Sequence, residues 1–239
     1  VGSTSLLVTL FTGFLIGMGA GVNVRVAHGL GAGNQKETEE TIHSSFLICL
    51  VTGLIICAVG LTSSRAFLTL LHTKDELMEG AVNYLQIYSL GMPAMGLYNF
   101  GNGVMSARGD TKRPLVYLLI AGVLNVIMNL IFVIGFHMAA EGVAIASVMA
   151  QYTSAGLVLH HLWRRRDVCR LQLRKVRFHR MAGQAVLILG IPGGLQQAIF
   201  AIANLFVQAG VNSFDAVTVS GNAAAANTDP LVYNSMFAF

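Results

Sequence analysis

Long stretches without a charged side chain are the feature that most limits how this chain can fold. Six of them run for 22 or more residues without Asp, Glu, Lys or Arg, and a seventh is interrupted only by Asp229. A bilayer core about 30 Å thick is crossed by roughly 20 helical residues, and lipid offers backbone amide and carbonyl groups no other partner. The pattern therefore predicts an all-α, polytopic membrane protein. The stretches are 1–24, 41–64, 80–107, 114–140, 142–163, 181–214 and 216–239.

Basic residues are distributed unevenly over the connections between these stretches. Alternate connections carry thirteen Lys and Arg against two. The positive-inside rule places the richer set, 25–40, 106–114 and 164–182, in the cytoplasm. The pI near 9.2 comes mostly from these segments. Anionic membrane lipids explain this charge better than nucleic acid does, because no basic domain is predicted that could hold a nucleic acid.

The order of predicted elements divides the chain at one long basic segment. Residues 1–163 are expected to form most of an N-terminal lobe, 164–183 a cytoplasmic linker, and 184–239 the start of a C-terminal lobe. The linker mixes cations with Leu171, Leu173, Val176 and Phe178, which predicts that it lies on the inner membrane surface. Helices are expected near 3–27, 43–64, 82–106, 114–136, 141–163, 184–210 and 216–239, with a polar connection at 29–42.

The predicted orientation bears on the ends of the chain. The first helix would begin outside the membrane, and the sequence opens with Val1 rather than Met. We interpret this as an internal fragment of a longer transporter-like protein. Glycines at 13, 17 and 21 form a small-residue stripe that predicts close helix packing, and Pro93 and Pro192 predict kinks.

Several observations argue against an enzyme. The sequence contains no pair of intramembrane aspartates, no HExxH pair and no Gly-x-Ser-x-Gly turn. Cys49, Cys57 and Cys169 show neither a disulfide framework nor the spacing of a metal site. We therefore predict no cofactor and no structural metal.

Uncharged polar residues occupy several of the predicted spans. Asn125 and Asn129 are four residues apart and share a helix face. Any single amide is explained by an interhelical hydrogen bond, but a dozen polar residues over four helices favour a water-accessible path, and hence a channel or transporter over a scaffold. Candidate cavity residues are Gln196, Gln197, Asn204 and Asn227.

Asp229 is the only carboxylate well inside a predicted span. A lone intramembrane acid suits coupling to Na⁺ or a proton. The alternative is that Asp229 bonds backbone groups freed by Pro230.

Four motifs, in order and spanning almost the whole chain, resemble the multidrug and toxic compound extrusion (MATE) family. They match that family's turn after helix two, its loop between helices four and five, and the starts of helices six and seven. They are Gly29-Leu30-Gly31-Ala32-Gly33-Asn34, Arg108-Gly109-Asp110-Thr111-Lys112-Arg113-Pro114, Gly142-Val143-Ala144-Ile145-Ala146-Ser147 and Ile191-Pro192-Gly193-Gly194-Leu195-Gln196. The chain would then hold about helices two to eight of twelve.

The resemblance implies a monomeric two-lobe antiporter of the cell membrane that exports organic cations or drugs in exchange for Na⁺ or H⁺. The family's N-lobe cation site falls on Asn125, Asn129 and Ser147, where this chain has Asn rather than Asp at the second position. Asp229 is added as a further candidate. The alternatives are a lipid-linked oligosaccharide flippase of the same superfamily, whose cavity is usually rich in Arg or Lys, and a non-transporting membrane scaffold.

Overall fold

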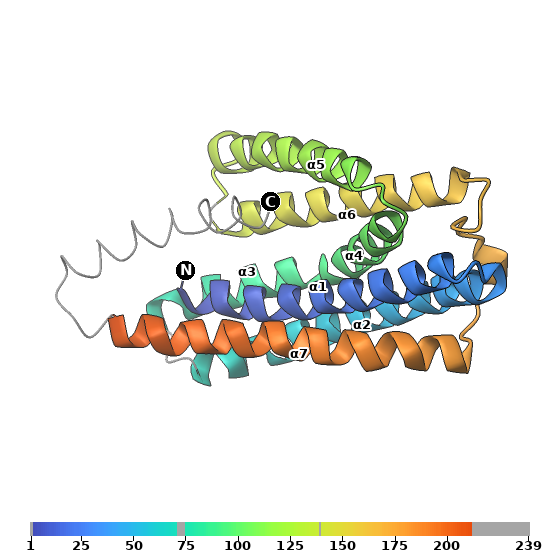
Figure 1. Cartoon of the computed structure of the whole chain (residues 1–239). Coiled ribbons are helices and arrows are strands. Elements are labelled where there is room, and N and C mark those ends of the chain that lie inside the picture. Colours follow the sequence, from blue (N-terminus) through green and yellow to red (C-terminus); the bar gives the residue numbers. More distant parts are fainter. Residues whose placement is uncertain (1, 71–74, 139, 212–239) are drawn as a thin grey trace. The chain divides into compact units, whose positions relative to one another are not determined.

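The structure of the chain is a computed structural model that describes residues 2–70, 75–138 and 140–211. Within these ranges the chain is almost entirely helical and contains no strand, which confirms the all-α prediction (Figure 1). The helices are α1 (Gly2–Gly31), α2 (Gln35–Leu70), α3 (Asp75–Ser89), α4 (Met92–Ala107), α5 (Lys112–Leu130), α6 (Ala140–Arg164) and α7 (Arg180–Val211), with a π-helical turn η1 (Ile131–Gly135) and a 3-10 turn η2 (Leu173–Lys175).

Five of the described helical segments are long and apolar enough to cross a membrane. They lie in α1, α2, α5 with η1, α6 and α7. The apolar side chains on their outer surfaces, such as Leu119 and Val123 on α5, are largely exposed within the chain, as expected for helices that face lipid. The protein is therefore a multi-pass membrane protein.

The expected helix at 82–106 is not continuous. The structure divides it into α3, which begins earlier at Asp75, and α4, with a break at Leu90–Gly91. Pro93 lies in the first turn of α4; it has no N–H to donate, and its ring would collide with the carbonyl four residues earlier, that of Ser89. The break therefore falls where the proline requires it. Pro192, by contrast, lies inside α7, which continues through it.

The polar connection predicted at 29–42 is much shorter in the structure, because the helices on both sides extend into this range. Only residues 32–34 separate α1 from α2. Gly33 has φ +68°, a conformation that glycine adopts without strain. Asn34 then caps α2: its Oδ1 accepts from the Glu37 N–H at 3.2 Å, and its Nδ2 donates to Glu37 Oε2 at 3.0 Å. The same Glu37 pairs with Arg25 at 2.8 Å.

Helix α4 is central to the packing of the N-terminal part of the chain, because it contacts α1, α2 and α6 (Figure 1). Small residues allow these approaches: a Cβ on Gly103 would lie 2.6 Å from the Gly19 carbonyl oxygen, and one on Gly53 would lie 2.7 Å from Pro93 Cα. Helix α5 packs mainly against α6. The chain divides into two compact units, Val1–Ala198 and Ile199–Phe239, and this packing belongs to the first.

The linker between α6 and α7 docks on the helices through part of its apolar surface. Leu171 is 3% exposed and Cys169 is fully buried, and both join the same core as Phe100 on α4. Leu173 and Phe178 remain exposed. The linker thus uses some of its apolar side chains for the protein interior and leaves others exposed, and its position on the inner membrane surface stays a prediction.

Candidate cation and substrate site

A chain of hydrogen bonds joins three uncharged side chains between α5 and α6. Asn129 Nδ2 donates to Asn125 Oδ1 at 3.0 Å, and Asn125 Nδ2 donates to Ser147 Oγ at 3.4 Å. The Ser147 hydroxyl donates in turn to the Val143 carbonyl at 2.9 Å. The structure therefore brings together the three residues that the sequence proposed as one polar group.

One acceptor in this chain of bonds stays open. Asn129 Oδ1 is buried and accepts no hydrogen bond from any residue that the structure describes. A buried polar atom without a partner costs about 1–3 kcal/mol, so such an atom in a native protein calls for a ligand, an ion or water. The side chains of this group are two amides and a hydroxyl, whose oxygen atoms can coordinate a cation and carry no formal charge.

The helix geometry changes directly beyond Asn129. The π-helical turn η1 follows α5 at Ile131, and the Phe136 N–H donates to the Ile131 carbonyl at 3.1 Å. Short π segments in membrane and soluble helices occur frequently at functional sites. From Asn125 to the end of η1 at Gly135 is ten residues, about 15 Å along the helix. The amide pair therefore lies well inside the span.

The sixth-helix motif explains why α6 approaches this region so closely. A Cβ on Gly142 would lie 3.0 Å from Phe132 Cβ in η1. Ala144 and Ala146 are fully buried. Gly142 thus lets the first turn of α6 approach η1 closely, one helical turn before Ser147.

The other sequence-proposed residues are not joined to this group. Gln196, Gln197 and Asn204 lie on α7 with exposed side chains. Gln197 contacts α1, since a Cβ on Gly13 would lie 3.2 Å from Gln197 Cβ. Asn227 and Asp229 lie outside the described residues, so their proposed roles stay predictions.

Sequence reasoning missed an ion-pair network that ties the α4–α5 loop to the linker. Asp110 accepts from Arg113 at 2.8 Å and from Arg165 at 3.2 Å, and Arg108 pairs with Asp167. Burial lowers the pKa of the Arg165 guanidinium below its ordinary value, and the neighbouring cation Arg108 lowers it further. The loop motif contained part of the signal, because a single acid, Asp110, stands among the three cations of 108–113.

The chain as a whole is similar to known proteins. The family profile described as MatE matches residues 1–131. A "Probable multidrug resistance protein YpnP" of Bacillus subtilis (strain 168) is 29% identical over 232 residues, which is 96% of this chain and 51% of that protein. A "Probable multidrug resistance protein NorM" of Thermotoga maritima is 23% identical over 211 residues, covering 84% of this chain and 45% of that protein.

Solved structures agree on the fold. A chain titled "Crystal structure of MATE in complex with MaD3S" superposes with a TM-score of 0.88 at 21% identity, over 97% of this chain and 52% of the other. An inward-facing MATE transporter of the MOP superfamily gives a TM-score of 0.82 at 20% identity, over 95% of this chain and 54% of the other. At these identities the likeness concerns the fold alone. The chain spans about half the length of the curated relatives it matches.

Proposed function

The chain belongs to the MatE family, and from that premise we propose that it works in a cation-coupled antiporter, a transporter and not an enzyme, that exports organic cations and related drugs across the cytoplasmic membrane. Two relatives carry "multidrug resistance" in their names. The protein would act as a monomer in contact with membrane lipids.

The observation that carries the proposal is the open acceptor at Asn129 Oδ1, at the end of the hydrogen-bonded chain that runs through Asn125 to Ser147. Neutral oxygen atoms inside a span are ligands for a cation that has lost its hydration shell. An amide takes up no proton near neutral pH, so this group supports Na⁺ in particular. Asp229 is the candidate for proton coupling.

The charge of the described spans supports a cationic or neutral cargo. In α1, the basic residue that lies furthest from the helix ends is Arg25. Glu37 neutralises it, since Arg25 Nη2 lies 2.8 Å from Glu37 Oε1. A cavity for a phosphate-linked cargo would instead need several free cations.

The test compares two hydroxyl residues on α6 in the full-length protein, reconstituted in proteoliposomes with imposed Na⁺ or pH gradients and a fluorescent organic cation. Ser147 and Thr153 each donate to a carbonyl four residues earlier, but only Ser147 also accepts from Asn125. We expect Ser147→Ala to weaken the apparent Na⁺ affinity of efflux about tenfold, and Thr153→Val to leave it unchanged. Equal effects of both variants, or efflux that ignores both gradients, would refute the proposal.

A further inference from the structure

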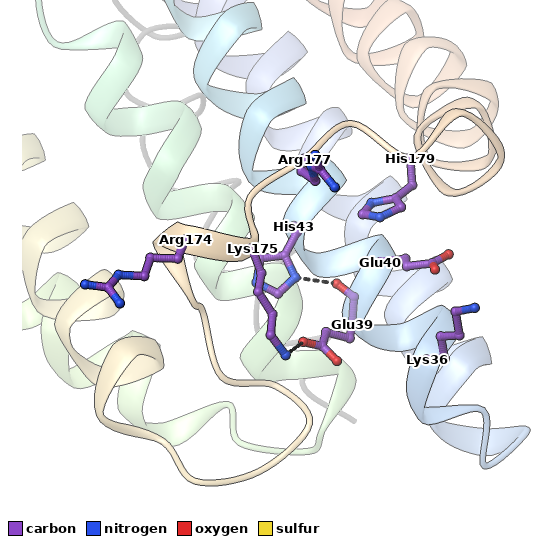
Figure 2. Close-up of a pocket in the computed structure, with 8 residues that line it drawn as sticks. All are labelled: Lys36, Glu39, Glu40, His43, Arg174, Lys175, Arg177 and His179. Atoms are coloured by element: carbon purple, nitrogen blue, oxygen red, sulfur yellow. Dashed lines mark hydrogen bonds and ion pairs between the residues drawn. The ribbon is translucent and has the colours of Figure 1, made fainter.

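A hollow of about 350 Å³ lies where the start of α2 meets the end of the linker (Figure 2). It belongs to neither the Asn125 group nor the amides of α7. Charged and histidine side chains dominate its wall, four from α2 and four from the linker. They are Lys36, Glu39, Glu40 and His43, with Arg174, Lys175, Arg177 and His179.

Some of these side chains already have hydrogen-bond or ion-pair partners within the protein, and their bonds hold the wall of the hollow together. Lys175 Nζ pairs with Glu39 Oε1 at 2.9 Å. His43 is 1% exposed, and its Nε2 accepts from the Gln172 N–H at 3.2 Å while its Nδ1 lies 2.7 Å from the Glu39 carbonyl. The ring is therefore neutral, with the proton on Nδ1. These bonds fix the linker to α2 and preform the wall.

The remaining cations have no such partners. No hydrogen bond or ion pair joins the side chains of Lys36, Arg174 or Arg177 to any residue in the described part of the chain. Figure 2 shows Arg174 directed away from the others, whereas Arg177 and His179 lie above the turn that carries Glu40 and Lys36. His179 Nδ1 is buried and also lacks a partner among the described residues.

The charge of the wall suits an anion. The Lys175–Glu39 pair cancels and Arg174 is directed away, so Lys36 and Arg177 stand against Glu40 alone, and one positive charge remains uncompensated. A phosphodiester carries one negative charge and accepts hydrogen bonds from guanidinium, ammonium and imidazole groups.

The surroundings indicate that the phosphate belongs to a lipid. Leu173 and Phe178 are 64% and 53% exposed beside the hollow, and Met181, two residues beyond His179, is 86% exposed. Two turns further along α7, Ile188 is 69% exposed. An acyl chain could follow this surface, while a free phosphate would leave it uncovered.

We propose that the hollow between α2 and the linker binds the phosphate headgroup of an anionic phospholipid, held by Lys36, Arg177 and His179. The lipid would stabilise the docked linker, because the headgroup would bridge side chains of both elements. Basic pockets beside membrane helices on the cytoplasmic side are suited to this role, and the positive-inside rule predicts that side for this end of the chain.

The test measures the affinity for the first bound lipid by native mass spectrometry of the full-length protein in detergent, with phosphatidylglycerol or phosphatidylcholine as probe. Lys36→Gln and Arg177→Gln should each weaken phosphatidylglycerol binding about fivefold and leave phosphatidylcholine binding unchanged. Arg170→Gln is the matched control, because Arg170 is an exposed cation of the same linker that does not line the hollow; its effect should stay below about twofold.

Two results would overturn the proposal. An equal loss in Arg170→Gln would show a diffuse surface charge in place of a site. Competition by glycerol phosphate at the same concentrations as dioctanoyl phosphatidylglycerol would show a site for free phosphate. A melting temperature within the wild-type range for each variant ensures that the loss reflects binding.

Discussion

Cys169 lies in a polar connection, yet its side chain is fully buried in the core beneath the linker. Burial also raises the pKa of its thiol above the ordinary value, against the opposing effect of Arg108. Because the thiolate is the reactive form, both features slow alkylation.

The test uses two proteins, both with Cys49→Ala and Cys57→Ala. One keeps Cys169, and the other carries Cys169→Ala and Arg170→Cys, so that its thiol is at the exposed position 170. We predict that Cys169 reacts with a maleimide at least about tenfold more slowly than the thiol at position 170. The alkylation rate of an ordinary exposed thiol levels off once the pH exceeds its pKa of about 8.5. The Cys169 rate should keep rising beyond that pH, since a raised pKa keeps the group protonated longer. Comparable rates at both positions would mean that the linker does not dock.

Glycine 17 illustrates a different residue-scale constraint. A Cβ at this position would overlap the backbone of Gly193 and Gly194 on α7, and Gly21 meets Gly190 in the same way one turn further along. The small-residue stripe on α1 is thus the surface on which the first part of α7 packs, as close packing of membrane helices requires.

We predict that Gly17→Ala lowers the free energy of unfolding in detergent by about 1–3 kcal/mol, because the added methyl group separates the two backbones. Gly156 on α6 has no atom within 4 Å of the position of its Cβ. Gly156→Ala should therefore be neutral or stabilise by up to about 1 kcal/mol through helix propensity. Melting curves of the two variants measure the difference, and a stable Gly17→Ala protein would contradict the packing.

At the scale of elements, the linker behaves as a docked segment that is held at its beginning and at its end as well as in between. Asp110 holds its beginning through Arg165, whose side chain is 11% exposed. Ser44 on α2 holds its end, since Ser44 Oγ accepts from the His179 N–H at 3.0 Å. Movement between α6 and α7 would therefore have to occur beyond His179 or after release of these bonds.

We predict that Asp110→Asn increases amide hydrogen exchange across 165–172, because it removes the negative charge that pairs with a mostly buried guanidinium and costs about 1–3 kcal/mol locally. Arg113→Gln removes the other ion pair of Asp110, but the Arg113 side chain is 56% exposed. That control should cost less than about 1 kcal/mol and leave the exchange unchanged. Equal exchange in both variants would count against the anchor.

At the scale of the whole molecule, three segments that are distant in sequence meet at one end of the helices. The α4–α5 loop contacts the linker through Arg108 and Asp167, and the start of α2 contacts it through Glu39 and Lys175. These are the segments that the distribution of Lys and Arg placed together on one membrane side.

We predict that Lys112→Cys and Arg170→Cys, in a cysteine-free background, are labelled by a membrane-impermeant maleimide only from the cytoplasm. Phe136→Cys, directly after η1 at the other end of this span, should be labelled only from outside. Intact cells and inverted vesicles provide the two measurements. External labelling at position 112 would reverse the orientation.

Much of this architecture was accessible from sequence because each feature depends on a short, local pattern. Charge-free length predicts a membrane helix without any knowledge of its neighbours. The four-residue spacing of Asn125 and Asn129 places them on one face, and the family motif added Ser147. Their hydrogen bonds in the structure follow from that spacing together with the close approach of α6.

Other features depended on tertiary contacts and could not be predicted. Whether Leu171 and Cys169 face lipid or protein depends on the core that they join, which includes Phe100 on α4, about seventy residues away in sequence. The hollow beside His43 exists only because the linker returns to the start of α2. A sequence pattern gives the polarity of such residues, but which surface they bury is determined by the elements that pack against them, because burial is a property of both partners.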